Sequence, residues 1–292
     1  MIHARWGDSG AFGFNCNAQD FNVKWLKILL AVAALLLFAF GVFVWATRPD
    51  AGPGKVVVPA KTPFTKGSYF AFAQPWGGEM VTVLKPWSPH ADSFVVDLDR
   101  FPANTTFHWR WPPVSAGFGP GVWGYDAVMY GNYDGGEPER PLPQIRMRDL
   151  RELRQRFAWT MENRFGDGNV LTEFYLRSST TDVNAKVIEV GWFLHMPAST
   201  RAFFERSAPV GVFVDAQKRR WMVRMAEKFC MFAPEKSEDL RSGTLDMLPA
   251  LEWLRQKGKI SGDEWMSGLA IGVEPVRGLG SLSVDQWSVT MR

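Results

Sequence analysis

NVLTEFYLRSSTTDVNAKVIEVGWFLHMP (residues 169–197) predicts a β-hairpin, because two runs rich in β-branched and aromatic residues flank a polar connection. Side chains alternate between the two faces of a strand. In the second run one face is entirely apolar and carries Ile188, Val190, Trp192, Leu194 and Met196. The other face carries Val187, Glu189, Gly191, Phe193 and His195. An acid, a glycine, an aromatic and a histidine together are typical of a substrate groove.

The first run of this hairpin divides in the same way. One face carries Leu171, Glu173, Tyr175 and Arg177, and the other carries Val170, Thr172, Phe174 and Leu176. Glu173 and Glu189 are therefore expected on the same face of the paired strands. The alternative is a solvated outer face on which the two glutamates only balance Arg177 and His195, and these residues alone leave both interpretations open.

Residues 64–292 are expected to form one all-β domain, a β-sandwich of the jelly-roll type. Short runs rich in Val, Phe, Tyr and Trp are separated by turns such as PPVSAGFGPG and GDGN. One helix is expected over LPALEWLRQKG (248–258), with Asp246 as its N-cap and Gly258 at its C-terminal end. RMRDLRELRQR (146–156) is interpreted as a short, solvated amphipathic turn or helix.

ILLAVAALLLFAFGVFVWAT (28–47) contains no charged residue and is long enough for a helix to span the hydrocarbon core of a bilayer. The alternative is a cleaved signal peptide, but the apolar run exceeds the usual ~7–15 residues of such a segment, so we favour a retained anchor. Residues 1–27 then form a short tail on the cytoplasmic side, and the Pro- and Gly-rich residues 48–63 form a linker. The globular domain is expected outside the cytoplasm, in the periplasm or the extracellular space.

Charge and composition argue against several classes of function. The net charge is +3, and the basic residues are scattered among acids, so nothing indicates nucleic acid as a partner. Cys16 and Cys230 lie on opposite sides of the expected span, so no disulfide is expected. The four histidines show no ligand spacing. We therefore expect neither a metal nor a cofactor, and a monomeric domain.

Six short motifs, in order along the chain, resemble those of glycoside hydrolase family 12, the jelly-roll endoglucanases and xyloglucanases. The resemblance runs from about Tyr69 to Val289. The motifs are YFAFAQPWGG (69–78), FHWRWPP (107–113), GVWGYDAVMYGNY (121–133), NVLTEFYL (169–176), EVGWFL (189–194) and GVEPVRGLGSL (272–282).

The resemblance implies a retaining endo-β-glycanase that hydrolyses a β-1,4-linked glucan or a related polysaccharide. It makes Glu189 the nucleophile and Glu274 the acid/base, and Glu173 stands in the position of a family aspartate. Glu173 lies across the hairpin from Glu189 and is the candidate for tuning it. This chemistry needs two carboxyl groups with different protonation states. The residues expected to contact substrate are Trp76, Trp109, Trp111, Tyr125, Phe193 and His195.

Two departures from the family pattern lie beside the expected nucleophile. Gly191 stands in place of a methionine and Phe193 in place of a tryptophan, so we expect a roomier groove floor there. These departures, together with Glu173, leave open a carbohydrate-binding protein that has lost activity on the same fold. A structural partner in an envelope polysaccharide complex is a further alternative, and the apolar segment 28–47 is its only support in the sequence.

Overall fold

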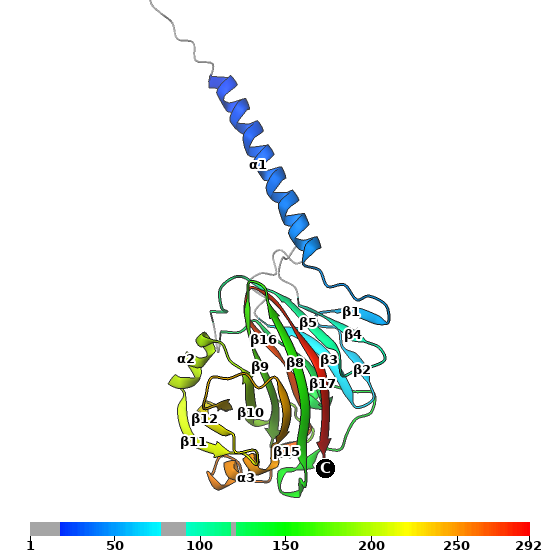
Figure 1. The fold of residues 1–292 in the computed structure, drawn as a ribbon, viewed down its shortest axis with the longest axis vertical. Coiled ribbons are helices and arrows are strands. Elements are labelled where there is room, and N and C mark those ends of the chain that lie inside the picture. The colour runs from blue at the N-terminus through cyan, green and yellow to red at the C-terminus, as the bar shows by residue number, and fades with distance from the viewer. Residues whose placement is uncertain (1–17, 77–91, 118–120) are drawn as a thin grey trace, which may run out of the picture. The chain divides into compact units, whose positions relative to one another are not determined.

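The structure is a computed structural model that describes residues 18–76, 92–117 and 121–292 (Figure 1). The chain divides into two units, Met1–Arg48 and Pro49–Arg292, and each is described by itself. Most of the expected N-terminal tail, with His3 and Cys16, lies outside the described residues, and so does His90.

The first unit contains one long helix, α1 (Ala18–Ala46). Its residues Val23–Ala46 are long and apolar enough to cross a membrane, and their large apolar side chains are exposed. A helix that is apolar on all sides has no polar face to turn toward water. The described part of the N-terminal region therefore provides a candidate membrane span that begins a few residues before the expected one and includes Lys24 and Lys27.

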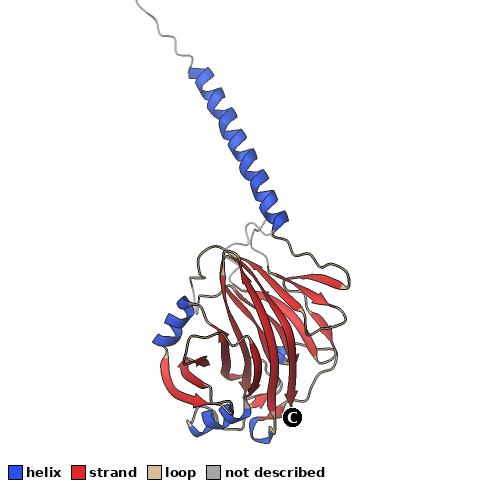
Figure 2. Ribbon diagram, viewed as in Figure 1, coloured by secondary structure: helices blue, strands red, loops and turns tan. Residues whose placement is uncertain are grey.

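The second unit is built from two β-sheets (Figure 2). The six-stranded sheet has the order β1 (Lys55–Pro59), β4 (Ser93–Asp97), β5 (Thr105–Arg110), β17 (Leu279–Met291), β8 (Leu153–Asn163), β14 (Ser242–Asp246). The larger sheet has the order β11 (Ala208–Val214), β12 (Arg220–Ala226), β13 (Phe229–Pro234), β10 (Lys186–His195), β9 (Asp167–Arg177), β16 (Gly268–Arg277), β6 (Gly124–Gly131), β3 (Tyr69–Pro75), β2 (Phe64–Lys66). Two short strands, β7 (Ile145–Arg146) and β15 (Trp265–Met266), join it beside β9. The predicted all-β jelly roll is confirmed.

The main core lies between the two sheets. The smaller sheet contributes Phe94, Phe107, Trp109 and Phe157 to it, and the larger sheet contributes Phe174, Val190, Trp192 and Ile271. Because side chains alternate along each strand, this core takes one face of the larger sheet and leaves the other available for a site. The apolar face predicted for the second hairpin run packs in this main core, through Ile188, Val190, Trp192 and Leu194.

The predicted hairpin over residues 169–197 is formed by β9 and β10. The two strands pair antiparallel, with Glu189 opposite Tyr175 and Gly191 opposite Glu173. The register shifts between Phe193 and His195, where His195 pairs with Val170. Up to Phe193 the two faces are therefore those that alternation predicts, and the shift changes the pattern at the end of β10.

The segment expected to be a linker, residues 48–63, contains an edge strand. β1 pairs antiparallel with β4 along its whole length, and Val58 is buried. Three consecutive valines favour a strand, and Pro59 is tolerated because it ends a strand at the sheet edge. The Pro and Gly content of the flanking residues concealed this strand, and the sheet begins at Lys55 rather than at residue 64.

The helices differ in part from expectation. The predicted helix is α3 (Leu248–Gln256), but its N-cap position is Met247, which makes no side-chain capping hydrogen bond, and Asp246 ends β14. A second helix, α2 (Ala198–Arg206), was not predicted. It directly follows Pro197 and is only nine residues long, which is too short for its apolar residues to show a clear helical period in the sequence.

The basic segment 146–156 is also different from the prediction. A 3-10 turn, η3 (Met147–Asp149), is followed by β8 from Leu153 onward. Leu153, Gln155 and Phe157 alternate into the core, and Gln155 donates from Nε2 to the Thr172 hydroxyl of β9 at 2.9 Å. Burial in this segment therefore alternates with the period of a strand. The side-chain amide of Gln155 is buried, although its polarity predicts a surface position.

Candidate active site

A cavity of about 550 Å³ lies on the face of the larger sheet that points away from the main core; we call it the groove. The three glutamates singled out in the sequence all line it. The described lining residues are Gln74, Trp76, Tyr125, Tyr133, Asp134, Glu173, Tyr175, Glu189, Phe203, Ala226, Glu227, Phe229 and Glu274.

Strand register brings the glutamates together. Glu173 in the middle of β9 lies opposite Gly191 of β10 on one side and Ala270 of β16 on the other. Glu189 is two residues along β10 from Gly191, and Glu274 lies farther along β16. Because residues two or four apart on neighbouring strands share a face, all three carboxyl groups point into the groove.

Glu173 and Glu189 share a hydrogen bond in which Glu173 is the protonated partner. Burial, followed by the charge of Glu189, raises the pKa of Glu173 well above its usual range. Burial also raises the pKa of Glu189 to about 7, and the hydrogen bond from Glu173 opposes that rise. The Tyr133 hydroxyl donates to Oε1 of Glu173. Near neutral pH the pair therefore holds one proton on Glu173 and directs it at an ionised or partly ionised Glu189.

Glu274 is in a different electrostatic setting. Its carboxyl group is buried, and burial is the main cause that raises its pKa to about 8. Asn169, which lies opposite Glu274 in β9, donates from Nδ2 to Oε2 at 2.8 Å and opposes the rise. A carboxyl group that keeps its proton at neutral pH can act as a general acid.

An ion-pair network borders the groove near Glu189. Asp134, in the 3-10 turn η2 (Tyr133–Gly135), accepts from Arg177 at 3.2 Å and from Lys186 at 2.6 Å. The Lys186 ammonium also lies 3.7 Å from the ring centroid of Tyr175, and its charge lowers the pKa of Glu189. Lys186 therefore favours the ionised form of Glu189, whereas the charge of Asp134 opposes it.

Comparisons with known proteins identify the fold. No protein-family model and no curated protein matches the chain. Solved structures do match. A family 12 xyloglucanase from Bacillus licheniformis superposes with a TM-score of 0.63 at 17% identity, over 82% of this chain and 99% of that one. Endoglucanase 3 of family 12 from Trichoderma harzianum gives 0.60 at 14% identity, over 83% and 100%. An endoglucanase from Rhodothermus marinus gives 0.61 at 18% identity, over 81% and 99%.

This chain has the family 12 glycoside hydrolase fold. The fold expected from the six short motifs is therefore confirmed. Identities of 14–18% show the fold alone, so activity and substrate are inferred below from the site itself.

Within this family 12 fold, two of the expected aromatic contacts do line the groove. Trp76 follows β3 and is 42% exposed. Tyr125 on β6 is almost fully buried, and burial followed by the charge of Glu173 raises its pKa well above the usual range. Trp76 can therefore offer a flat face to a ligand, whereas Tyr125 forms part of the floor as a neutral hydroxyl.

The prediction for Trp109 and Trp111 is wrong. Trp109 is fully buried in the main core, where its Nε1 donates to the Arg277 carbonyl at 3.4 Å. Trp111 is also buried; it donates to Oδ1 of Asp92 at 2.8 Å and stacks on Trp123 with ring centroids 4.9 Å apart. Trp109 follows the core-facing alternation of β5, and Trp111 continues it just after the strand ends; β5 belongs to the sheet that does not carry the groove.

His195 and Phe193 were both predicted to contact substrate. The prediction is wrong for His195, and for Phe193 only the predicted face of the strand is correct. Phe193 points to the groove side but lies 2% exposed in the apolar layer beneath it. His195 lies beyond the register shift, where Nδ1 is 2.6 Å from Oδ1 of Asp239 and the ring meets Trp159 of the opposite sheet edge to face. A one-residue irregularity thus turns the histidine away from the groove.

The expectation of a roomier floor at Gly191 is also wrong. A Cβ atom at this glycine would lie 2.8 Å from Cε2 of Phe229. Phe229, on the parallel neighbour β13, therefore fills the space that a longer side chain at position 191 would take. No sequence signal links these residues, because nearly forty positions separate them along the chain.

Several residues that line or border the groove were not among the predicted site residues. They are Gln74, Tyr133, Asp134, Asn169, Tyr175, Lys186, Phe203, Glu227 and Phe229. Asn169 and Tyr175 share the predicted face of β9 and could have been included from alternation. Lys186 begins β10, where the register is irregular, and the others come from turns, from α2 or from β3 and β13, whose neighbours are remote in sequence.

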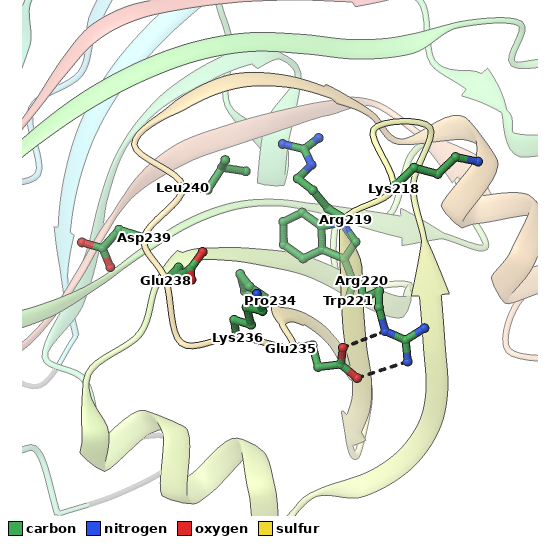
Figure 3. A pocket seen from close by; sticks show the side chains of 10 residues that line it. All are labelled: Lys218, Arg219, Arg220, Trp221, Pro234, Glu235, Lys236, Glu238, Asp239 and Leu240. Carbon is green, nitrogen blue, oxygen red and sulfur yellow. Dashed lines mark hydrogen bonds and ion pairs between the residues drawn. The ribbon is translucent and has the colours of Figure 1, made fainter.

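A second cavity, of about 380 Å³, lies between the β11–β12 turn and the segment that follows β13 (Figure 3). Arg220 forms a two-pronged ion pair with Glu235, and the Arg219 guanidinium is held by Asp215. Trp221 is 1% exposed and offers no face to a ligand. Much of the charge here is used in structural pairs, so the groove is the stronger candidate for chemistry.

Proposed function

We propose that this chain is a retaining β-glycanase that hydrolyses a β-1,4-linked glucan or a related polysaccharide, with Glu189 as nucleophile and Glu274 as acid/base. The observation that carries the proposal is that Glu189 and Glu274 line one groove of a family 12 fold, and burial raises the pKa of Glu274, to about 8, above that of Glu189, about 7. The solved neighbours described as xyloglucanase and endoglucanase support a β-glucan as the substrate class.

The mechanism follows from the different environments of Glu189 and Glu274. Glu189 attacks the anomeric carbon of the sugar while Glu274 gives its proton to the departing glycosidic oxygen, which breaks the C–O bond and leaves a glycosyl ester on Glu189. Glu274, now ionised, takes a proton from water, and the resulting hydroxide attacks the anomeric carbon and releases Glu189. The product keeps the β configuration.

Glu173 acts through Glu189 and is a positioning residue. Its proton forms a hydrogen bond to the Glu189 carboxylate and helps to orient it, and Tyr133 in turn orients Glu173. That hydrogen bond weakens as Glu189 loses its charge to the sugar and strengthens again when the ester is cleaved. The step that releases Glu189 therefore benefits from Glu173.

The test is hydrolysis of a panel of β-glucans, xyloglucan and bacterial exopolysaccharides by the purified chain. Glu189→Gln and Glu274→Gln should each remove turnover, whereas Glu162→Gln, at an exposed position of β8, should not. An activated fluoro-sugar should label Glu189 and leave Glu274 unmodified. Retained turnover in Glu189→Gln, or a first product with the α configuration, would refute the mechanism.

The alternative is a carbohydrate-binding protein without turnover. One observation favours it: a pKa of about 7 leaves Glu189 partly protonated at neutral pH, which weakens it as a nucleophile. Tight binding of an oligosaccharide with no product at any pH between 6 and 9 would select this alternative.

We also propose that α1 anchors the chain in a membrane with the catalytic domain on the non-cytoplasmic side. The apolar, exposed length of Val23–Ala46 supports a span, and a polysaccharide substrate would be met outside the cytoplasm. Protease added to intact spheroplasts should digest the domain. Full protection of the domain would reverse the orientation, and a chain that starts after residue 47 in cells would show that the helix is a cleaved signal.

A further inference from the structure

One end of the groove, beyond Glu189, is walled by aromatic side chains. Phe229 of β13 lies beside Glu189 in the parallel pairing of β10 and β13. Its ring covers the backbone of Gly191, with Cε2 and Cζ lying 2.8 Å and 3.1 Å from where a Cβ would stand. A side chain at position 191 would displace the ring from this place, so Gly191 and Phe229 form one unit.

The helix α2 supplies a second aromatic wall through Phe203. Its last turn is tied to β12, because Nη1 of Arg224 donates to the carbonyl oxygens of Glu205 and Ser207 at 2.8 Å and 2.7 Å. Phe204, next in the helix, is buried, and the Arg224 guanidinium lies 5.7 Å from its ring centroid. Phe203 is therefore carried on a fixed element rather than a loose loop.

The third member is Glu227, in the two-residue turn between β12 and β13. It lines the groove, and its backbone is left-handed, with φ of 53°. Turn positions of this kind favour Gly or Asn, because other side chains are strained there. No ion pair or hydrogen bond of the Glu227 side chain occurs among the described residues, so folding gains nothing evident from a glutamate at this strained position. Because Glu227 also lines the groove, its carboxylate is placed to meet a ligand.

We propose that Phe229 seated over Gly191, Phe203 of α2 and Glu227 form a subsite that binds one sugar ring of the substrate. The C–H face of the ring packs on the aromatic side chains, and the Glu227 carboxylate accepts hydrogen bonds from its hydroxyl groups. This subsite rests on the proposed function, since it presumes a carbohydrate in the groove.

The first test is binding of cellohexaose and of a xyloglucan heptasaccharide by the full chain in detergent, measured by calorimetry in a Glu189→Gln background so that the sugars are not consumed. Phe229→Ala should weaken binding about tenfold, which is the loss expected for one aromatic contact. Gly191→Ala should weaken it as well, because the new methyl group displaces the ring. Phe165→Ala, which removes an 85% exposed ring in the β8–β9 turn, is the control and should bind normally.

The second test separates binding from folding. Glu227→Asn should raise the melting temperature, because asparagine suits the left-handed turn, and should weaken binding several-fold. Lys218→Asn relieves the same strain in the β11–β12 turn, with φ of 63°, but lies outside the groove; it should raise the melting temperature and leave binding unchanged.

The outcomes are distinct. Equal binding by the parent, Phe229→Ala and Glu227→Asn would overturn the subsite and leave the proposed function intact. A parent chain that binds neither oligosaccharide would overturn the subsite together with the choice of a β-glucan substrate.

Discussion

Two groups of buried carboxyl groups lie on opposite faces of the larger sheet. Glu173, Glu189 and Glu274 face the groove, whereas Asp126 of β6 points into the core toward Asp92, just before β4. Burial is the first cause of the raised pKa in both groups, to about 8 for Glu274 and for Asp92. A raised pKa by itself therefore does not mark a catalytic residue.

The groups differ in what surrounds them. The groove carboxyl groups face a cavity of about 550 Å³ and receive hydrogen bonds from Tyr133 and Asn169. In the core pair, Asp126 is fully buried and the Trp111 indole donates to Asp92. Access to a ligand therefore distinguishes the candidate site from the core pair.

The largest expected difference between the two groups is in activity. Glu274→Gln should lower kcat/KM by about 10²–10⁴-fold, the usual range for loss of a general acid. Asp126→Asn should leave kcat/KM within a few-fold of the parent chain, because it faces the other side of the sheet. Steady-state kinetics on the best substrate of the panel measures both. Equal losses in the two variants would mean that the core pair supports the site.

The core pair should instead control stability. The folded chain holds protons on Asp92 and Asp126 that the unfolded chain releases near pH 4, because both folded pKa values are raised. The contribution of this pair to stability should therefore be most favourable below about pH 4 and should fall as the pH rises toward about 8. Asp126→Asn should remove part of that fall and add about 1–3 kcal/mol to the free energy of unfolding at pH 8.

Denaturant unfolding at pH 4, 6 and 8 measures this stabilisation. Asp99→Asn, at an exposed position after β4, is the matched control and should show no such pH-dependent gain. A variant Asp126→Asn that is destabilised equally at all three values would show that the folded pair is ionised and satisfied.

Removing one hydrogen-bond donor from each group of carboxyl groups should give a smaller difference in activity and stability between them. Trp111→Phe removes the hydrogen bond to Asp92 and should cost about 1 kcal/mol of stability with little effect on turnover. Tyr133→Phe removes the donor to Glu173 and should lower kcat with little effect on the melting temperature. Thermal melts and steady-state kinetics on the two variants measure these effects. A loss of turnover in Trp111→Phe but not in Tyr133→Phe would contradict the difference between the two groups.

The smallest effect concerns the pH profile. Activity should rise as Glu189 ionises near pH 7 and fall as Glu274 loses its proton near pH 8. Lys186→Met removes a charge that lowers the pKa of Glu189, so the acidic limb of kcat/KM should move to higher pH by a fraction of a unit. Lys257→Met, at the end of α3, should leave the profile in place. An unchanged limb in Lys186→Met would show that its charge is screened from Glu189.

Alternation along single strands could be read from the sequence, and it was correct wherever the strand was regular. The groove face of β9 and the core face of β10 follow directly from it, and so does the shared side of Glu173 and Glu189. His195 fails because a register shift precedes it, and Trp109 because alternation does not say which sheet a strand joins. Val58 was missed because the Pro and Gly around a short edge strand resemble a linker.

The sequence by itself determined the all-β architecture, the apolar segment near the N-terminus and the three glutamates, because period, length and local motif are properties of neighbouring residues. Only the tertiary structure decided how the protons are shared, that Phe229 occupies the space over Gly191, and that Asp92 meets Asp126 in the core. These depend on which distant strands lie side by side. Burial then sets the pKa values and the packing, and a carboxyl group has no fixed burial until the sheets are assembled.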